Sequence, residues 1–197
     1  VENLKNPNEA NESSRFYFCT LIISYMITIT IRKFIETHTY SPIMNEILKL
    51  SQKNSRPFYE LNELLVENNL TRNDIKQEAL DVFLDLIEMV VQDDCIIEDE
   101  IQSVHLLKMY LGIEENEFKL YDRMERVKRI ITEQMEQLYT DNTIDYHERI
   151  YKSKLQGLFG LGYDEFQEIV DKVALVAYAR GAEMKDLDTF LDYGVEL

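Results

Sequence analysis

One stretch of the sequence occurs twice, at a fixed distance of 48 residues. Residues 93–100 read Asp-Asp-Cys-Ile-Ile-Glu-Asp-Glu, and residues 141–148 read Asp-Asn-Thr-Ile-Asp-Tyr-His-Glu. The same offset pairs the positions that follow each copy: Leu107 with Leu155, Leu111 with Phe159, Gly112 with Gly160, Ile113 with Leu161, Glu117 with Glu165 and Phe118 with Phe166. A period in this range is typical of repeated helical pairs, so the sequence predicts a helical pseudo-repeat.

The second copy carries the signals that begin and end a helix. Asp145 is a predicted N-cap, and Glu148, three residues later, completes a capping box. The helix is expected to end near Gly160, which adopts a left-handed conformation without strain, and Gly162 caps the next helix. The first copy is expected to end in the same way at Gly112. The unit is therefore a helix, an acidic turn, a helix, a glycine stop and another helix.

This pattern resembles a known helical family. Both copies read Asp-x-x-Ile-x-x-x-Glu, followed by a helix and then Leu/Phe-Gly-Ile/Leu-x-x-x-Glu-Phe. The pattern resembles the TerB-like (tellurite-resistance TerB) helical domain, in which duplicated acidic turns between helices have been thought to chelate metal. The resemblance covers about residues 81–197. It implies an all-helical fold and a cytoplasmic role in bacterial stress response or defence.

The composition also favours an all-α fold. Three prolines and six glycines in 197 residues leave little material for the turns of a β fold. We predict an N-terminal helical region, residues 1–80, with an apolar helix over 16–35. A TerB-like helical bundle is predicted over 81–197, with repeat units at about 81–128 and 129–176 and a C-terminal cap at 177–197.

The negative charge is concentrated in the second part of the chain. Residues 1–76 hold 9 basic and 9 acidic side chains, whereas residues 77–197 hold 12 basic and 28 acidic ones, which accounts for the whole net charge of −16. Such a surface repels phosphate backbones and anionic lipids, so we expect no nucleic-acid partner. It favours basic partners or cations. Solvated acidic helix faces that serve only solubility are the alternative interpretation.

The apolar segment 16–31 contains no charged residue. It is shorter than the roughly 20 residues that span a bilayer, and it contains threonine, serine and tyrosine. We therefore expect a helix buried in the core or in a subunit interface. A β-strand and a membrane helix are the alternatives, and a homo-oligomer is compatible with the interface interpretation.

Further helix starts are predicted at Ser41-Pro42, at Pro57 and at Thr71. At Thr71, Asp74 in the third helical position is expected to accept a hydrogen bond from the backbone of the capping residue. A long amphipathic helix is predicted over residues 118–138. Its basic cluster comprises Arg123, Arg126, Lys128 and Arg129. We expect this cluster to form a solvated face of ion pairs within the helix, such as Glu125 with Arg129.

The usual motifs of catalysis are absent from the sequence. It contains no Gly-rich phosphate loop, no nucleophile elbow, no Cys-x-x-Cys and no His-Glu-x-x-His. We therefore expect no enzymatic activity and no certain cofactor. Cys19 and Cys95 are the only cysteines, which is typical of a reducing cytoplasm.

The acidic turns are the candidate metal site. Asp141, Asp145 and Glu148 lie at i, i+4 and i+7 and offer the hard oxygen ligands that Ca²⁺ or Mg²⁺ prefers. His147 is a ligand better suited to Zn²⁺ or Mn²⁺. The corresponding acids of the first turn are Asp93, Glu98 and Glu100. The competing interpretation is that these acids only cap or end helices.

The resulting hypothesis is a non-enzymatic, acidic, cytoplasmic scaffold that docks another protein through its acidic surface or through residues 16–31. The alternative is a sensor in which a divalent cation (Ca²⁺, Mg²⁺ or Mn²⁺) bridges the two turns through Asp93, Glu100, Asp141, Asp145 and Glu148. An N-terminal membrane anchor is a third possibility, and it rests on residues 16–31 alone.

Overall fold

The structure is a computed structural model that describes residue 34 and residues 38–52, 57–91 and 98–183. The all-α prediction is confirmed: these residues form α-helices and one short 3-10 helix, and no strand occurs among them. No helix in these ranges is long and apolar enough to cross a membrane. The apolar segment 16–31 and most of the predicted C-terminal cap lie outside the described residues.

The chain divides into two units, residues 1–69 and 70–197. In the first, α2 (Pro42–Ser51) packs against α3 (Pro57–Glu67). The predicted start of α2 is confirmed, because the Ser41 side chain accepts a hydrogen bond from the Met44 N–H at 3.2 Å and Pro42 occupies the first turn. The predicted start at Pro57 is confirmed as well.

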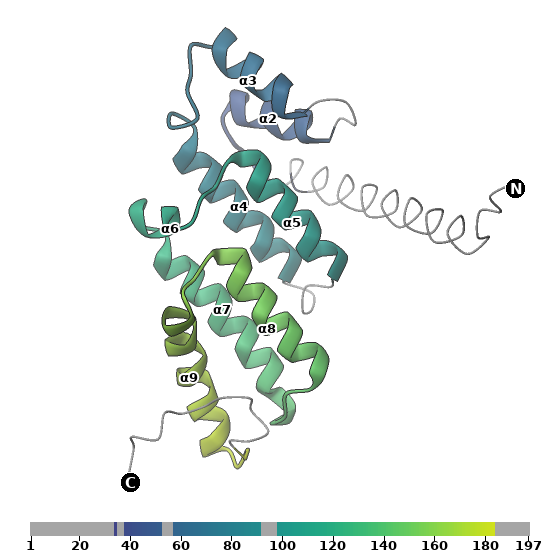
Figure 1. The fold of residues 1–197 in the computed structure, drawn as a ribbon, viewed down its shortest axis with the longest axis vertical. Helices are drawn as coiled ribbons and strands as arrows, with labels where there is room; N and C mark the ends of the chain where they lie inside the picture. Colours follow the sequence, from purple (N-terminus) through teal and green to yellow (C-terminus); the bar gives the residue numbers. More distant parts are fainter. Residues whose placement is uncertain (1–33, 35–37, 53–56, 92–97, 184–197) are drawn as a thin grey trace, which may run out of the picture. The chain divides into compact units, whose positions relative to one another are not determined.

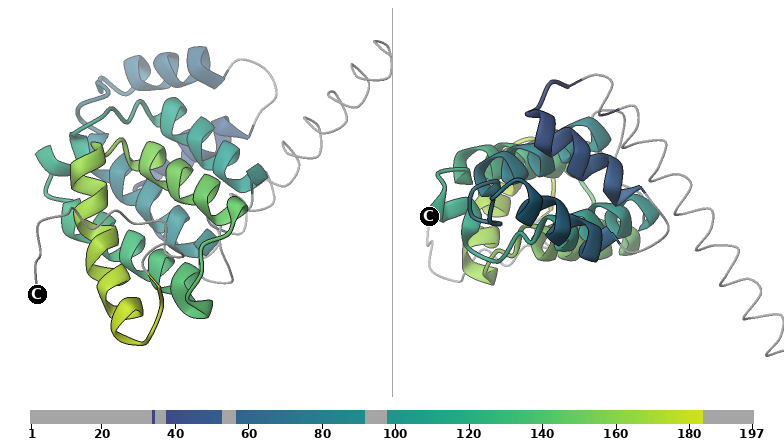
Figure 2. Two further views of the ribbon diagram at one scale, coloured as in Figure 1. Left: turned by 60° about the horizontal axis from the view of Figure 1, so that its bottom comes forward. Right: turned by 90° about the horizontal axis from the view of Figure 1, so that it is seen from above.

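The second unit contains two helical hairpins. One consists of α4 (Lys76–Val91) and α5 (Glu98–Leu111), and the other of α7 (Met124–Leu138) and α8 (Tyr146–Phe159). The hairpins stack, with α4 against α7 and α5 against α8 (Figure 1). The last helix, α9 (Tyr163–Ala179), packs on α7, and Figure 2 shows this arrangement from two other directions. The short helices α6 (Glu117–Leu120) and η1 (Tyr139–Asp141) lie in the connections.

The 48-residue spacing of the sequence recurs in the helix bounds. Moving both ends of α5 by 48 residues gives the ends of α8, and moving the start of α4 gives the start of α7. The helix stops also match. Gly112 and Gly160 have φ of 66° and 64°, and the N–H of the residue after each donates back across the last turn to Lys108 O and Gln156 O, respectively. The two hairpins are therefore structurally equivalent in register.

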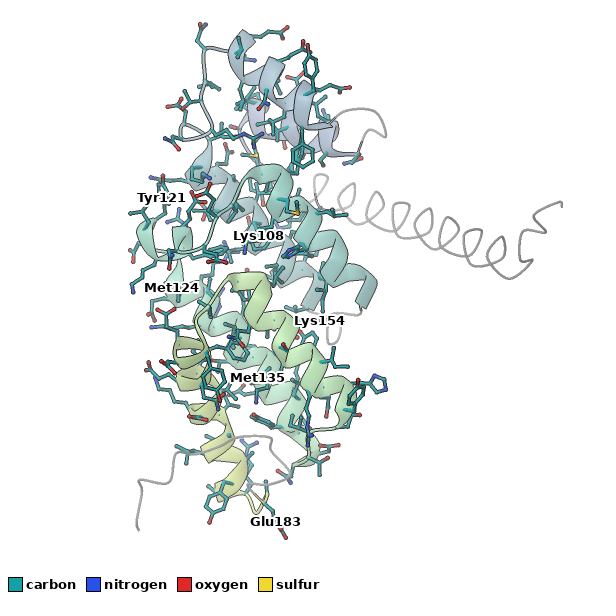
Figure 3. The ribbon with its side chains drawn as sticks, viewed as in Figure 1. Lys108, Tyr121, Met124, Met135, Lys154 and Glu183 are labelled. Carbon is teal, nitrogen blue, oxygen red and sulfur yellow. The ribbon has the colours of Figure 1, made fainter. Side chains whose placement is uncertain are left out.

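The core of this unit runs through both hairpins. Phe83 of α4 contacts Phe118 at a ring-centroid distance of 5.8 Å, and Phe118 contacts Phe159 of α8 at 5.9 Å. All three rings are fully buried. Lys108 of α5, labelled in Figure 3, donates a buried hydrogen bond of 2.7 Å to the Leu158 carbonyl near the end of α8. A basic group at that position satisfies an end carbonyl and complements the helix dipole.

Two expectations about helix and region bounds differ from the structure. The helix predicted over 118–138 is broken, because Asp122 adopts a left-handed φ of 57° and the Arg123 N–H bonds back to Phe118 O at 2.6 Å. The chain therefore forms α6, a turn and α7 in place of one helix. We expected the N-terminal region to extend to residue 80, whereas the unit boundary of the structure precedes α4.

Candidate binding groove

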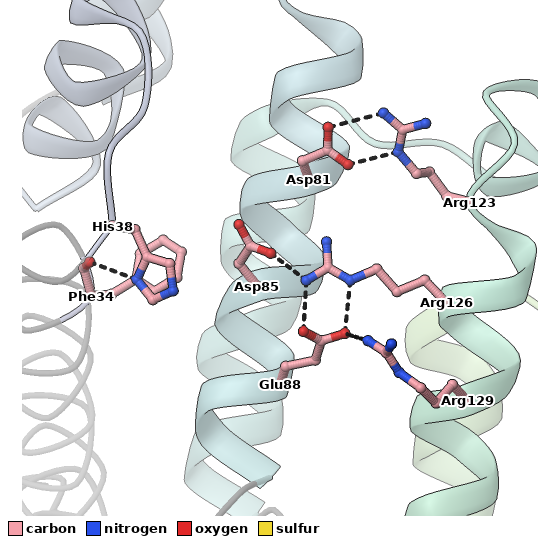
Figure 4. A network of polar contacts seen from close by, with 8 residues as sticks. All are labelled: Phe34, His38, Asp81, Asp85, Glu88, Arg123, Arg126 and Arg129. Carbon is pink, nitrogen blue, oxygen red and sulfur yellow. Dashed lines mark hydrogen bonds and ion pairs between the residues drawn. The ribbon is translucent and has the colours of Figure 1, made fainter.

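Three carboxylates on α4 face three arginines at the start of α7 (Figure 4). We call these six residues the charge ladder, and its members are Asp81, Asp85, Glu88, Arg123, Arg126 and Arg129. The acids lie at i, i+4 and i+7 of α4, and the arginines follow one another at three-residue intervals. Both spacings place the side chains on one helix face, so the two rows meet along the α4–α7 contact.

Arg126 is the centre of the charge ladder. Its Nε and Nη2 atoms donate to the two carboxylate oxygens of Glu88, each at 2.7 Å, and its Nη2 also donates to Asp85. Arg129 donates to Glu88 at 2.6 Å, and Arg123 binds Asp81 through two bonds of 2.6 and 2.9 Å. Paired bonds of this kind use the planar guanidinium fork, which a lysine ammonium lacks.

The charge ladder changes the acidity of its members. Hydrogen bonding to Arg126 lowers the pKa of Glu88 below its ordinary value, against the opposing effect of partial burial. Bonding to Glu88 and Asp85 raises the pKa of Arg126, and bonding to Asp81 raises that of Arg123. These contacts therefore hold Glu88, Arg123 and Arg126 more firmly in their charged forms.

This arrangement corrects the interpretation of the basic cluster. We expected ion pairs within one helix, such as Glu125 with Arg129. The arginines instead bind α4, Arg129 through Glu88, and Glu125 pairs with Lys128 at 3.0 Å. The missed signal is the row of acids at 81, 85 and 88, which lie on one helix face as the arginines about 40 residues later do.

A groove of about 600 Å³ opens at the end of the charge ladder, where α4 finishes and α7 continues. It is lined by Glu88, Val91, Arg129, Glu133, Gln134, Glu136, Gln137 and Thr140. Glu133 and Glu136 are exposed. Arg129 binds Glu88 at 2.6 Å, and its distance to Glu133 is longer, at 3.9 Å. Among the described lining residues, Glu88 and Arg129 are therefore already bound to each other, and Glu133 and Glu136 are the exposed carboxylates.

The inner wall of the groove is polar and fixed. Gln134 is 1 % exposed and accepts a hydrogen bond from the Tyr151 hydroxyl of α8. Its amide nitrogen donates to Gln137 Oε1 at 3.0 Å. A buried amide with partners on two sides holds α7 in register with α8. The groove is thus a preformed polar surface on a packed helix.

Of the residues predicted to bind metal, Asp141, Asp145 and Glu148 are not among the residues that line the groove. Asp93 lies outside the described residues, and Glu100 lies in α5 with its side chain not described. Asp141, Asp145 and Glu148 lie in η1 and at the start of α8. The structure therefore describes the side chains of the second acidic turn only.

The acids of that turn all bond to nearby backbone. The predicted capping box is confirmed: Asp145 accepts the Glu148 N–H at 2.9 Å, and Glu148 accepts the Asp145 N–H at 2.7 Å. Asp141 accepts bonds from the backbone and hydroxyl of Thr143, both at 3.0 Å. Among the described side chains, no three His, Cys, Asp or Glu residues come together as metal ligands would. Cation binding across both turns stays a prediction.

The TerB-like resemblance also stays a prediction, because the helical fold alone does not identify a family. Comparison of the chain with protein-family models, with curated proteins and with solved structures found no match in any of the three.

Proposed function

We propose that this chain is a non-enzymatic interaction module that binds a basic segment of a partner protein in the α4–α7 groove. One observation carries the proposal: Glu88, Glu133 and Glu136 line a preformed groove, and Arg129 is the single basic residue among the described residues of its lining. Residues 77–197 also carry the whole net negative charge of the chain. A positively charged segment is attracted by the field of this part and is then held by the groove carboxylates.

The chemistry of the lining favours a polar, basic segment over an apolar ligand. Among the lining residues that the structure describes, Val91 is the only aliphatic one, and it is 5 % exposed. Apart from Arg129, the other lining residues offer carboxylate, amide and hydroxyl oxygens, which accept hydrogen bonds from lysine and arginine. Such contacts give specificity and a fast, salt-dependent association.

The test is a titration of the full chain with a fluorescein-labelled arginine-rich peptide, followed by fluorescence anisotropy. The double variant Glu133→Gln, Glu136→Gln removes two groove charges. The matched control Asp164→Asn, Glu168→Gln removes two exposed charges from α9, and neither of these lines the groove.

We expect the groove variant to bind about tenfold more weakly, because each lost contact between exposed charges costs up to about 1 kcal/mol. The control is expected to change affinity by less than about threefold. Equal losses in both variants would show that the peptide senses net charge alone, and the groove proposal would then be abandoned.

A further inference from the structure

The equivalence of the two hairpins indicates what the partner looks like. The 48-residue shift that carries α4 onto α7 carries Asp85 onto Glu133 and Glu88 onto Glu136. Two carboxylates of the charge ladder therefore recur on α7 at equivalent positions. Asp85 and Glu88 of α4 bind an arginine of α7, which belongs to the other hairpin, whereas Glu133 and Glu136 line the groove.

The arginine row does not recur. The same shift carries Arg126 onto Ala174 and Arg129 onto Ala177, both buried in α9. The helix α9, which packs on α7, thus has methyl groups at the positions where α7 has the guanidinium groups that bind α4. Asp85 and Glu88 are thus held by short bonds to Arg126, whereas Glu133 lies 3.9 Å from Arg129 and lines the groove together with Glu136.

We infer that the groove binds an amphipathic helix of a partner protein that carries arginines at three-residue spacing, the spacing that Arg123, Arg126 and Arg129 have in this chain. This inference rests on the proposed function and specifies the partner of the same site. The chain provides its own example of the interaction, in which Arg126 reaches Asp85 and Glu88 together and Arg129 reaches Glu88 as well.

The dimensions agree with a helix. Glu133 and Glu136 are separated by about 4.5 Å along α7, and arginines three residues apart on a partner helix have the same separation. The lining from Arg129 to Thr140 extends over about 16 Å of helix, which is enough for three arginines in successive turns. The planar guanidinium fork favours arginine over lysine at such a site, because it binds one carboxylate through two parallel bonds.

The experiment compares two fluorescein-labelled peptides on an Ala/Gln helical background, titrated into the full chain. The first has three arginines at i, i+3 and i+6 on one face. The second has the same composition, but its arginines are spread around the helix. Circular dichroism verifies that the two peptides have equal helicity. Sedimentation of the unlabelled chain at several concentrations reports self-association.

We expect the one-face peptide to bind at least about tenfold more tightly than the spread peptide. Glu133→Gln, Glu136→Gln should abolish that difference, and Asp164→Asn, Glu168→Gln should preserve it. Equal binding of both peptides, lost in the groove variant, would overturn the spacing inference and leave the proposed function standing.

Absence of binding by either peptide would overturn both. Self-association that depends on Glu133 and Glu136 and excludes the peptides would identify a second copy of the chain as the occupant. That result would also overturn the inference.

Discussion

Replacing Arg126 by methionine should destabilise the second unit more than any single change at an exposed ion pair. Methionine keeps most of the length and apolar volume of the arginine side chain, so the change removes mainly the guanidinium group. Arg126 binds both oxygens of Glu88 and also reaches Asp85. Without it, Asp85 loses this cation and Glu88 keeps only Arg129.

The burial of the three side chains sets the magnitude. Arg126 and Asp85 are 23 % exposed and Glu88 is 26 % exposed, so the cluster lies between a surface pair and a buried one. Exposed pairs contribute up to about 1 kcal/mol, and breaking a fully buried pair costs about 3–5 kcal/mol. We expect Arg126→Met to lower the free energy of unfolding by about 2–3 kcal/mol.

The assay is urea denaturation followed by far-ultraviolet circular dichroism, with Lys128→Met as the matched control. Lys128 lies on the same helix, and its ion pair with Glu125 is exposed, at 50 % and 86 % for the two side chains. We expect the control to cost less than about 1 kcal/mol. If Arg126→Met costs no more than Lys128→Met, the charge ladder does not hold α4 to α7.

Three further predictions concern single residues, each measured by the same denaturation. The pKa of Glu88 is lower in the folded state than in the unfolded chain. Ionised Glu88 therefore stabilises the fold above a pH of about 4.3, and this contribution is lost as the pH falls through the folded-state pKa. Glu88→Gln should make the free energy of unfolding fall less steeply between about pH 5 and 3. Asp145→Ala should lower the free energy of unfolding by about 1 kcal/mol, and Asp145→Asn should lower it much less, because asparagine also caps helices. Equal losses for the two variants would contradict the capping role. Gly160→Ala should cost about 1–2 kcal/mol, since Gly160 has a φ of 64°. Gly157→Ala should stabilise by about 0.5–1 kcal/mol, because a Cβ added to Gly157 meets no atom within 4 Å. The opposite order would contradict the helix stop.

Local sequence signals predicted the ends of α8 well, whereas α4 begins at Lys76 and not directly after Thr71 as predicted. Asp145 and Glu148 form the predicted capping box, and Gly160 adopts the predicted left-handed conformation. Such signals act within a few residues, so they can be read without knowledge of the tertiary fold. The break at Asp122 was missed, because this turn contains neither glycine nor proline and an aspartate takes the left-handed position.

The charge ladder and the groove could not be predicted from one helix at a time. Arg129 has an acidic residue four positions away on each side, Glu125 and Glu133, so its sequence context favours an ion pair within the helix. In the structure it binds Glu88, which is 41 residues away. That choice depends on the packing of α4 against α7, which brings a second row of acids within reach of the arginines.

The 48-residue repeat was the most informative feature of the sequence. It predicted acidic turns and glycine stops, and the helix bounds of the structure follow the same spacing. The metal hypothesis placed the cation at the acidic turns, whereas the described acids of the second turn accept hydrogen bonds from backbone N–H groups of that turn. The repeat points instead to α7, where Glu133 and Glu136 occupy the positions of the Asp85 and Glu88 carboxylates.

The most direct test of the groove is chemical-shift mapping by nuclear magnetic resonance of the full, isotopically labelled chain with the one-face arginine peptide. The account predicts saturable shifts at the backbone amides of Glu133, Glu136, Gln137 and Thr140, which line the groove. Shifts centred on the exposed acids of α9, or shifts spread evenly over the acidic surface, would contradict it.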